Sequence, residues 1–417
     1  MPTSDVNDSG MMNKSRKRIL FIAEAVTLAH VARAAALAQM LDPAVYEVGL
    51  ACDPRYDFLF DGRRFERHRI ESISNRDFSN ALDKGSPIYD VDTLSRYVVD
   101  DIRVIEEFAP DVIVGDFRIS LSVSARVTGK PYINVTNAGW SPYAQPRFTV
   151  PDIALTRMLG VRIGQTVFSL ARPLAFALHS LPLDRLRRKY GLRSLRRDLR
   201  YTYTEADHVL YADIPELIPV FNPPSTHAYL GPVLWSPKLP DPSWIDRVPN
   251  DRPIIYLTLG SSGRNAVLPD VLDALADVPF TIVAATAGKL GPGQAAPNTF
   301  VADYLSGQTW ARRAAVVVCN GGSPTCYQAL AEGVPVLGIP GNLDQYLNMS
   351  AVEASGAGRL VRAGAATAAC IREAVMELVE SPRFASNAQR LGRAIEPWRP
   401  ATVLSETISK ALAGVAR

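Results

Sequence analysis

The chain has few of the residues that mark a disulfide-stapled or metal-rich protein, with four cysteines and five histidines in 417 residues. The cysteines form no C-x-x-C or C-x-x-H pattern, so neither a disulfide framework nor a zinc site is expected. Unpaired thiols favour a cytoplasmic location. The sequence also lacks an uninterrupted apolar run of about 18 residues, so no membrane-spanning helix is predicted.

An excess of charge of one sign is absent too. The 45 Lys and Arg residues nearly balance the 42 Asp and Glu residues, and the net charge of +3 gives no reason to expect a nucleic-acid partner. The sequence lacks three motifs of cofactor-binding and catalytic loops: the P-loop motif, the G-x-G-x-x-G motif of dehydrogenases and the G-x-S-x-G motif of serine hydrolases. These absences argue against all three enzyme classes.

Short apolar runs alternate with amphipathic helical segments in both halves of the chain. This alternation predicts an α/β fold with a parallel sheet and covering helices in each half. The expected strands are 18–23, 46–51, 111–115 and 131–135 in the first half, and 253–259, 280–284, 314–319 and 335–339 in the second.

A proline-rich stretch, residues 221–242, separates the two halves. Residues 1–13 are polar and expected to be disordered. We therefore expect a first domain over 14–235, a linker over 236–250, a second domain over 251–398 and a C-terminal helix over 399–417 that packs back on the first domain.

The strongest motif covers residues 319–345, C-N-G-G-S-P-T-C-Y-Q-A-L-A-E-G-V-P-V-L-G-I-P-G-N-L-D-Q. A strand ends here, and Gly321 and Gly322 allow a tight turn. Ser323 is a preferred helix cap, and Pro324 suits the first helical position. The free N–H groups and the positive dipole end of such a helix suit a phosphate at the carboxyl edge of the sheet. On these residues alone, an ordinary strand-to-helix turn without a ligand is the favoured interpretation.

This motif is similar to the donor-binding signature of family-1 glycosyltransferases, which are nucleotide-sugar enzymes of the GT-B fold. The signature is H-x-G-x-x-[ST]-x-x-E, then G-V-P, then D-Q. The positions that match in order and spacing are Gly322, Thr325, Gly333-Val334-Pro335 and Asp344-Gln345. Asn320 replaces the histidine and Gln328 replaces the glutamate. Both side chains can still hydrogen-bond, to a diphosphate oxygen and to ribose hydroxyls respectively. Because Gln328 lacks the carboxylate of the family's glutamate, the sequence does not decide the ribose contact or the identity of the nucleotide.

The resemblance implies further donor-binding residues. Asp344 and Gln345 would bind hydroxyls of the transferred sugar. Tyr304 would either stack on the base or pack against its neighbours. The phosphates would lie against backbone and hydroxyl groups of two loops: Gly260, Ser261, Ser262, Asn320, Gly321, Gly322, Ser323 and Thr325.

The catalytic base is expected in the first half. The segment Ala29-His30-Val31 resembles the G-H-V of the family, with His30 in the first turn of a helix. Asp116 follows the third strand and matches the acid that orients this histidine. The other four histidines lie in no comparable context.

Residues 60–100 and 140–205 would line the acceptor side, which includes the aromatic residues Trp140, Tyr143 and Phe148. The region 185–200 contains eight Lys and Arg residues. A solvated helix face is the favoured interpretation, and a weak contact with a membrane surface is the alternative. The apolar stretch 153–183 with interspersed arginines is compatible with a lipid-like acceptor.

Together these features predict an α/β GT-B protein of the bacterial natural-product type, with two Rossmann-like domains facing across a cleft. The expected activity is inverting transfer from a UDP- or dTDP-sugar to a hydroxyl of a natural-product or lipid-like small molecule. No metal and no cofactor beyond the co-substrate are expected, and the D-x-D of residues 90–92 is interpreted as surface charge. A nucleotide-sugar epimerase and a non-catalytic sugar-nucleotide-binding partner protein stay open as alternatives, and the oligomeric state is left undetermined.

Overall fold

The computed structural model describes residues 16–59, 65–237, 239–249, 251–260, 267–288 and 295–415. The expected tail over 1–13 and two predicted donor-loop residues, Ser261 and Ser262, lie outside this part of the chain.

The N-terminal half forms a parallel seven-stranded sheet in the order β3-β2-β1-β4-β5-β6-β7. The strand order reverses between β1 and β4, and Ala23 pairs with Asp116 where both strands end. Open α/β sheets bind ligands at such a switch point. The strands are β1 (Lys17–Ala23), β2 (Tyr46–Cys52), β3 (Glu66–Arg69), β4 (Val112–Asp116), β5 (Tyr132–Thr136), β6 (His208–Tyr211) and β7 (His227–Tyr229).

The C-terminal half forms a parallel six-stranded sheet in the order β10-β9-β8-β11-β12-β13. Here the switch point lies between β8 and β11, where Thr258 pairs with Cys319. The strands are β8 (Ile254–Thr258), β9 (Thr281–Ala285), β10 (Thr299–Ala302), β11 (Val316–Cys319), β12 (Val336–Gly338) and β13 (Gly358–Leu360).

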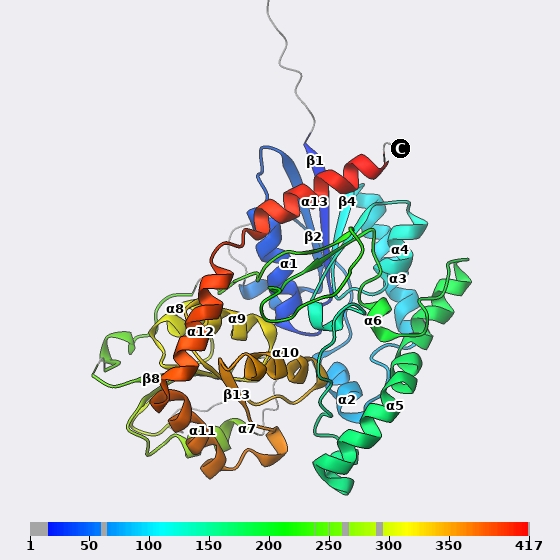
Figure 1. Ribbon diagram of the computed structural model, residues 1–417. Helices are drawn as coiled ribbons and strands as arrows, with labels where there is room; N and C mark the ends of the chain where they lie inside the picture. The colour runs from blue at the N-terminus through cyan, green and yellow to red at the C-terminus, as the bar shows by residue number, and fades with distance from the viewer. Residues whose placement is uncertain are drawn as a thin grey trace, which may run out of the picture.

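Helices cover the sheets, and the two halves stand as two lobes (Figure 1). The last helix crosses back to the N-terminal lobe, where Leu404 and Ile408 join the core beside α1. The helices are α1 (Leu28–Met40), α2 (Asn75–Lys84), α3 (Val91–Phe108), α4 (Leu121–Val127), α5 (Ala154–Lys189), α6 (Leu199–Thr202), α7 (Val267–Ala274), α8 (Gly307–Arg313), α9 (Ser323–Ala331), α10 (Leu343–Ala354), α11 (Ala368–Glu380), α12 (Pro382–Ile395) and α13 (Pro400–Val415). Within the described residues, no helix is both long and apolar enough to cross a membrane.

The central strands are apolar on both sides because both faces of each sheet are covered. In β1, Ile19 and Phe21 pack into one core cluster, and Leu20 and Ile22 pack into the cluster on the opposite face. Alternate side chains of a strand point to opposite faces, so one continuous apolar run serves two cores.

A buried ion network lies next to the carboxyl ends of β1 and β4. Arg118 donates to Glu24 at 3.0 Å and to Asp101 at 2.9 Å, and all three side chains are fully buried. Its guanidinium carbon also lies 3.6 Å from the centre of the Tyr97 ring. Burial raises the pKa of both carboxyls, and the charge of Arg118 opposes that rise. The network therefore depends on its single cation.

One histidine should make the fold sensitive to acid. Burial lowers the pKa of His227 to about 4, and its Nδ1 forms a hydrogen bond of 2.6 Å with the Tyr211 hydroxyl. The unfolded chain takes up this proton near pH 6.5, whereas the folded chain does so only near pH 4. Stability should therefore fall by about 1–2 kcal/mol from pH 7 to pH 4, after allowance for the partial exposure of His227.

Urea unfolding of the wild type and of His227→Gln at pH 7 and pH 5 tests this expectation. The variant should lose less stability than the wild type over this interval. An equal loss in both proteins would assign the acid sensitivity to other groups.

Candidate active site

His30 and Asp116 meet at the switch point of the N-terminal sheet. His30 lies in the first turn of α1, Asp116 is the last residue of β4, and His30 Nδ1 is 2.8 Å from Asp116 Oδ1. Asp116 is 2% exposed, whereas 20% of the His30 side chain is exposed. The carboxylate accepts, so Nδ1 carries the proton of the neutral ring and Nε2 carries the lone pair. No described residue forms a hydrogen bond with Nε2.

Arg33 is the third member of this group, and the motif reasoning did not select it. One turn beyond His30 on α1, it donates to both oxygens of Asp116, at 2.6 and 2.8 Å. Burial raises the pKa of Asp116, and the charge and hydrogen bonds of Arg33 lower it. The lowering is the larger effect together with the contribution of His30, so the pKa of Asp116 is below its usual value. Asp116 is therefore an anion that can hold the His30 ring and stabilise its protonated form.

Phe117 fixes the other side of the histidine. Its ring stacks on the imidazole at 4.6 Å with an angle of 7° between the planes. Phe117 has a φ of 56°, a left-handed conformation that side-chain-bearing residues rarely adopt. Such backbone strain is concentrated at functional sites. Here it turns the residue that follows Asp116 back over His30.

Phe117 belongs to a row of aromatic side chains that we call the aromatic wall, four of whose six members are buried. Its rings follow one another at centroid distances of 5.1–6.3 Å. The members are Phe78, Phe117, Trp140, Phe148, Phe176 and Tyr203. Two of the three aromatic residues expected on the acceptor side, Trp140 and Phe148, belong to it. The third, Tyr143, instead packs against His227 at 5.5 Å.

In the C-terminal lobe, the glycine loop leads from β11 into α9. Gly321 has a φ of 79°, and Gly322, with an extended backbone, is the N-cap of the helix. The sequence placed the cap at Ser323, one residue too late. The Ser323 hydroxyl instead accepts a hydrogen bond from Asn137 of the N-terminal lobe at 3.0 Å. Asn320 Oδ1 accepts from the Gly322 N–H at 3.0 Å and so holds the loop.

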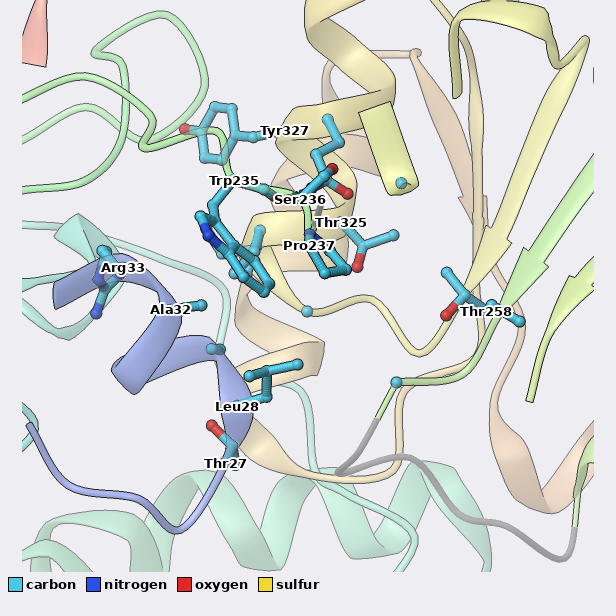
Figure 2. A pocket seen from close by; sticks show the side chains of 18 of the residues that line it. Thr27, Leu28, Ala32, Arg33, Trp235, Ser236, Pro237, Thr258, Thr325 and Tyr327 are labelled. Atoms are coloured by element: carbon cyan, nitrogen blue, oxygen red, sulfur yellow. Dashed lines mark hydrogen bonds between the residues drawn. The ribbon is translucent and has the colours of Figure 1, made fainter. Parts of the chain in front are cut away.

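A cavity of about 200 Å³, open to solvent, lies between the two lobes. Figure 2 shows α1, with Thr27 and Leu28 at its start, facing the segment of Thr325 across this cavity. The lining includes seven residues of the predicted donor site: Gly260, Tyr304, Asn320, Gly322, Ser323, Thr325 and Gln328. From the N-terminal lobe it includes Ala29 and Arg33, the neighbours of His30. The His30–Asp116 pair therefore borders the predicted donor site.

Gln328 is held by the segment between the lobes. Its Nε2 donates to the Trp235 carbonyl and, at 3.3 Å, to the Ser236 hydroxyl. A side chain at Gly307 would collide with Gln328 Oε1, so this glycine keeps room for the amide. Trp235 itself lines the cavity, and motif reasoning missed it. The predicted base-stacking residue, Tyr304, lies edge-on to Phe58 at 5.8 Å and is 36% exposed.

Asp344 and Gln345 begin α10, but they face different groups. Asp344 Oδ1 accepts from the Trp140 indole at 2.7 Å and so links α10 to the aromatic wall. Gln345 is buried, and its Oε1 accepts from the Gly341 N–H at 2.8 Å. Burial lowers the pKa of Arg33, and the carboxylates of Asp116, Asp213 and Asp344 raise it above its usual value. Asp344 therefore lies close enough to Arg33 to act on its charge.

Asn137 and Asp213 join the lobes behind the cavity and were not identified from the sequence. Asn137 accepts from Arg33 at 3.1 Å and donates to Asp213 as well as to Ser323. These contacts connect α1 to the N-terminus of α9. Within the described residues, no group of three or more His, Cys, Asp or Glu side chains could hold a metal ion.

Comparisons with known proteins identify the family of the chain. Residues 269–408 match the family model of the erythromycin biosynthesis protein CIII-like C-terminal domain. A PGL/p-HBAD biosynthesis rhamnosyltransferase of Mycobacterium bovis is 53% identical over 379 residues, which cover 91% of this chain and 84% of that protein. A second M. bovis relative, 51% identical over 62% of this chain and 71% of its own length, is named an inactive PGL/p-HBAD biosynthesis glycosyltransferase.

Among solved structures, the spinosyn forosaminyltransferase SpnP superposes with a TM-score of 0.69 at 18% identity. The match covers 96% of this chain and all of that one, so the GT-B fold predicted from the sequence is confirmed. The chain therefore belongs to the GT-B glycosyltransferase family that includes the PGL/p-HBAD biosynthesis enzymes.

Proposed function

We propose that this glycosyltransferase transfers rhamnose from a dTDP-sugar to a hydroxyl group on an aromatic acceptor, with inversion at the anomeric carbon and without a metal ion. The observation that carries the proposal is the position of His30. Its ring stacks on Phe117 of the aromatic wall, and two residues of the same helix, Ala29 and Arg33, line the predicted donor cavity.

His30 acts as the general base in this mechanism. Nε2 takes the proton from the acceptor hydroxyl while that oxygen attacks the anomeric carbon from the face opposite the diphosphate. The bond from the anomeric carbon to the diphosphate oxygen breaks, and the ring passes through an oxocarbenium-like state. Asp116, held ionised by Arg33, stabilises the imidazolium that forms.

The leaving diphosphate gains negative charge as the bond breaks. The N-terminus of α9 offers free N–H groups and the positive end of a helix dipole at this point, and Thr325 adds a hydroxyl. Because these donors are already in place, they stabilise the developing charge without reorganisation. Asp344 would bind a hydroxyl of the transferred sugar, since its carboxylate lies near both Arg33 and the aromatic wall.

Phe117 and Trp140, the two members of the aromatic wall that are only partly buried, support a ring-bearing acceptor. Offset or edge-to-face aromatic contacts contribute about 0.5–1.5 kcal/mol each beyond the burial of area. A ring bound against Phe117 would present its hydroxyl to the imidazole that stacks on the same phenylalanine. This chemistry is compatible with the pathway in the name of the M. bovis rhamnosyltransferase, which also motivates the choice of rhamnose.

The surroundings of Gln328 support dTDP over UDP. Its amide nitrogen is occupied by the Trp235 carbonyl and the Ser236 hydroxyl, so only Oε1 is left to accept from a ribose. A glutamate at this position could accept from both the 2′- and 3′-hydroxyls, whereas a deoxyribose has only the 3′-hydroxyl to offer.

Incubation with dTDP-rhamnose and UDP-sugars, each with a panel of phenols and aliphatic alcohols, tests the proposal. A product with the mass of acceptor plus deoxyhexose supports transfer, and its anomeric configuration by NMR tests inversion. Full activity after treatment with EDTA supports independence from metal. Conversion of the donor without an acceptor would indicate an epimerase. Donor binding with no product on any acceptor would indicate a non-catalytic partner, an outcome made relevant by the relative named inactive.

Gln328→Glu should shift the nucleotide preference. The new carboxylate cannot donate to the Trp235 carbonyl and would turn toward the ribose, where each hydroxyl can donate to it. We expect the ratio of kcat/KM for a UDP-sugar to that for the dTDP-sugar to rise by about tenfold, the effect of one charged hydrogen bond. Gln308→Glu, which adds the same charge on α8 outside the cavity lining, is the matched control. An unchanged ratio in Gln328→Glu would contradict the ribose contact.

A further inference from the structure

Helix α5 presents an unusual concentration of apolar side chains to solvent. Eight of the 17 large hydrophobic side chains that are exposed in the described residues lie on this one helix. They are Met158, Leu159, Val161, Ile163, Val167, Leu170, Leu174 and Leu178. Leu170 is 80% exposed and Leu174 is 65% exposed. Clusters of this kind on a protein surface mark binding sites, whereas single exposed apolar residues need no explanation.

Five of the eight form one stripe along the part of the helix that follows a break in its regular geometry at Gly160, which has a φ of 74°. Ile163, Val167, Leu170, Leu174 and Leu178 follow a spacing of three and four residues, which places them on one face. The opposite face is the one that packs on the protein, where Phe176 contacts Trp140 and Phe148 of the aromatic wall. Figure 1 shows α5 along the outer side of the N-terminal lobe. The stripe is thus outside the core and one helix diameter from the acceptor side of the active site.

Positive charges stand at both ends of the stripe. Arg157 and Arg162 are exposed at its start, and Arg185 and Arg188 are exposed beyond its end. Arg185 lies seven residues after Leu178, two helical turns further along the same face. The helix has one acidic residue, Asp184, which is buried and accepts hydrogen bonds from Ser194 and Leu195. No exposed acid therefore balances these cations on α5.

We propose that this face of α5 docks on the surface of an anionic lipid bilayer. An apolar stripe that enters the headgroup region, with arginines at its edges, is the pattern of an interfacial helix. A second copy of the chain is disfavoured as the occupant. Symmetric pairing of two such helices, parallel or antiparallel, sets the cationic ends of one helix against cationic ends of the other.

Docking in this position would place the aromatic wall beside the bilayer, with Phe176 on the inner side of the helix and Leu174 and Leu178 on the outer side. An acceptor with a lipid chain could then stay in the membrane while its hydroxyl group reaches His30. The docking surface itself requires no sugar transfer, so it stands or falls independently of the proposed reaction.

Co-sedimentation of the full-length protein with vesicles tests the docking. The wild type should bind vesicles of equimolar phosphatidylcholine and phosphatidylglycerol, and bind pure phosphatidylcholine much more weakly. Leu170→Ser combined with Leu174→Ser should weaken the binding by at least about tenfold, because two leucines lose their apolar contact. Arg185→Gln combined with Arg188→Gln should weaken binding to the anionic vesicles by about fivefold per arginine, with a smaller dependence on salt.

Val45→Ser combined with Phe221→Ser removes two exposed apolar side chains far from α5 in sequence and is the matched control. It should bind as the wild type does, and circular dichroism and Tm should show that every variant is folded. The proposal is overturned if the wild type stays in the supernatant with both vesicle types, or if the leucine variant binds as tightly as the wild type. Sedimentation velocity that shows dimers broken by the leucine variant, without vesicle binding, would assign the stripe to a second copy instead.

Discussion

Replacing His30 with alanine is expected to lower the rate of sugar transfer by about 10²–10⁴-fold, the usual contribution of a general base. The reason is geometric: Nδ1 is bound to Asp116 at 2.8 Å, so Nε2 is the acceptor that the substrate proton can reach. Initial rates with a saturating donor and a phenolic acceptor measure the effect. The affinity for dTDP should change little, because His30 is not part of the cavity lining that holds the predicted donor residues.

Two further variants separate catalysis from structure. His68→Ala removes a histidine that lies against Phe108, away from the site, and should retain near-normal activity. Asp116→Asn keeps the size of the side chain but removes the charge that pairs with Arg33 and the protonated ring, so it should also be slow. If His30→Ala turned over at the wild-type rate with a hydroxyl acceptor, the assignment of the base would be wrong.

Arg118→Met is expected to destabilise the fold by about 3–5 kcal/mol, the effect of breaking a buried ion network by removal of one partner. Glu24 and Asp101 would be left as buried carboxylates without their counter-ion. Urea unfolding at pH 7 measures the loss. Removing Arg118 should raise the pKa of both carboxyls in the folded state further. A carboxyl whose pKa is higher in the folded than in the unfolded state favours folding when it is protonated, and this stabilisation is lost as the pH rises. The difference in the free energy of unfolding between the wild type and Arg118→Met should therefore become smaller as the pH is lowered.

Arg103→Met is the matched control, because Arg103 forms exposed ion pairs with Asp100 and Glu107 on the same helix. Its effect should stay within about 0.5–1 kcal/mol, as for other surface ion pairs. Combining Arg118→Met with Glu24→Gln and Asp101→Asn should recover part of the lost stability, since no buried charge is then unpaired. An Arg118→Met deficit no larger than that of Arg103→Met would contradict the role of the network.

The parallel strands and the loop of the donor side were predictable from local sequence. Buried parallel strands are apolar on both faces, so runs such as Ile19–Ala23 stand out without any knowledge of their neighbours. The Gly-Gly turn and Pro324 likewise mark the start of α9 within a few residues. The cap was misplaced by one residue because the Ser323 hydroxyl bonds across the cleft to Asn137, and local propensity contains no information about that partner.

The charges around His30 show where sequence reasoning stopped. Asp116 was identified because it ends a strand and matches a known pattern, and it lies 2.8 Å from the histidine. Arg33 was not identified from the sequence, although it lies one turn from His30 and donates the other two hydrogen bonds to the Asp116 carboxylate. An arginine at that spacing on a helix is common on solvated surfaces, and only the burial of this one distinguishes it.

The sequence by itself determined the α/β class and the donor-side motif, because each is encoded in residues that are close together in the chain. It also determined the histidine–aspartate pair, because both residues follow strands whose carboxyl ends meet at one edge of a parallel sheet. Only the tertiary structure decided what surrounds them. The aromatic wall combines residues from 78 to 203, and Asn137 and Trp140 reach Ser323 and Asp344 in the other lobe. Contacts over such separations depend on how helices pack and how two sheets face each other, and no local pattern in the chain records them.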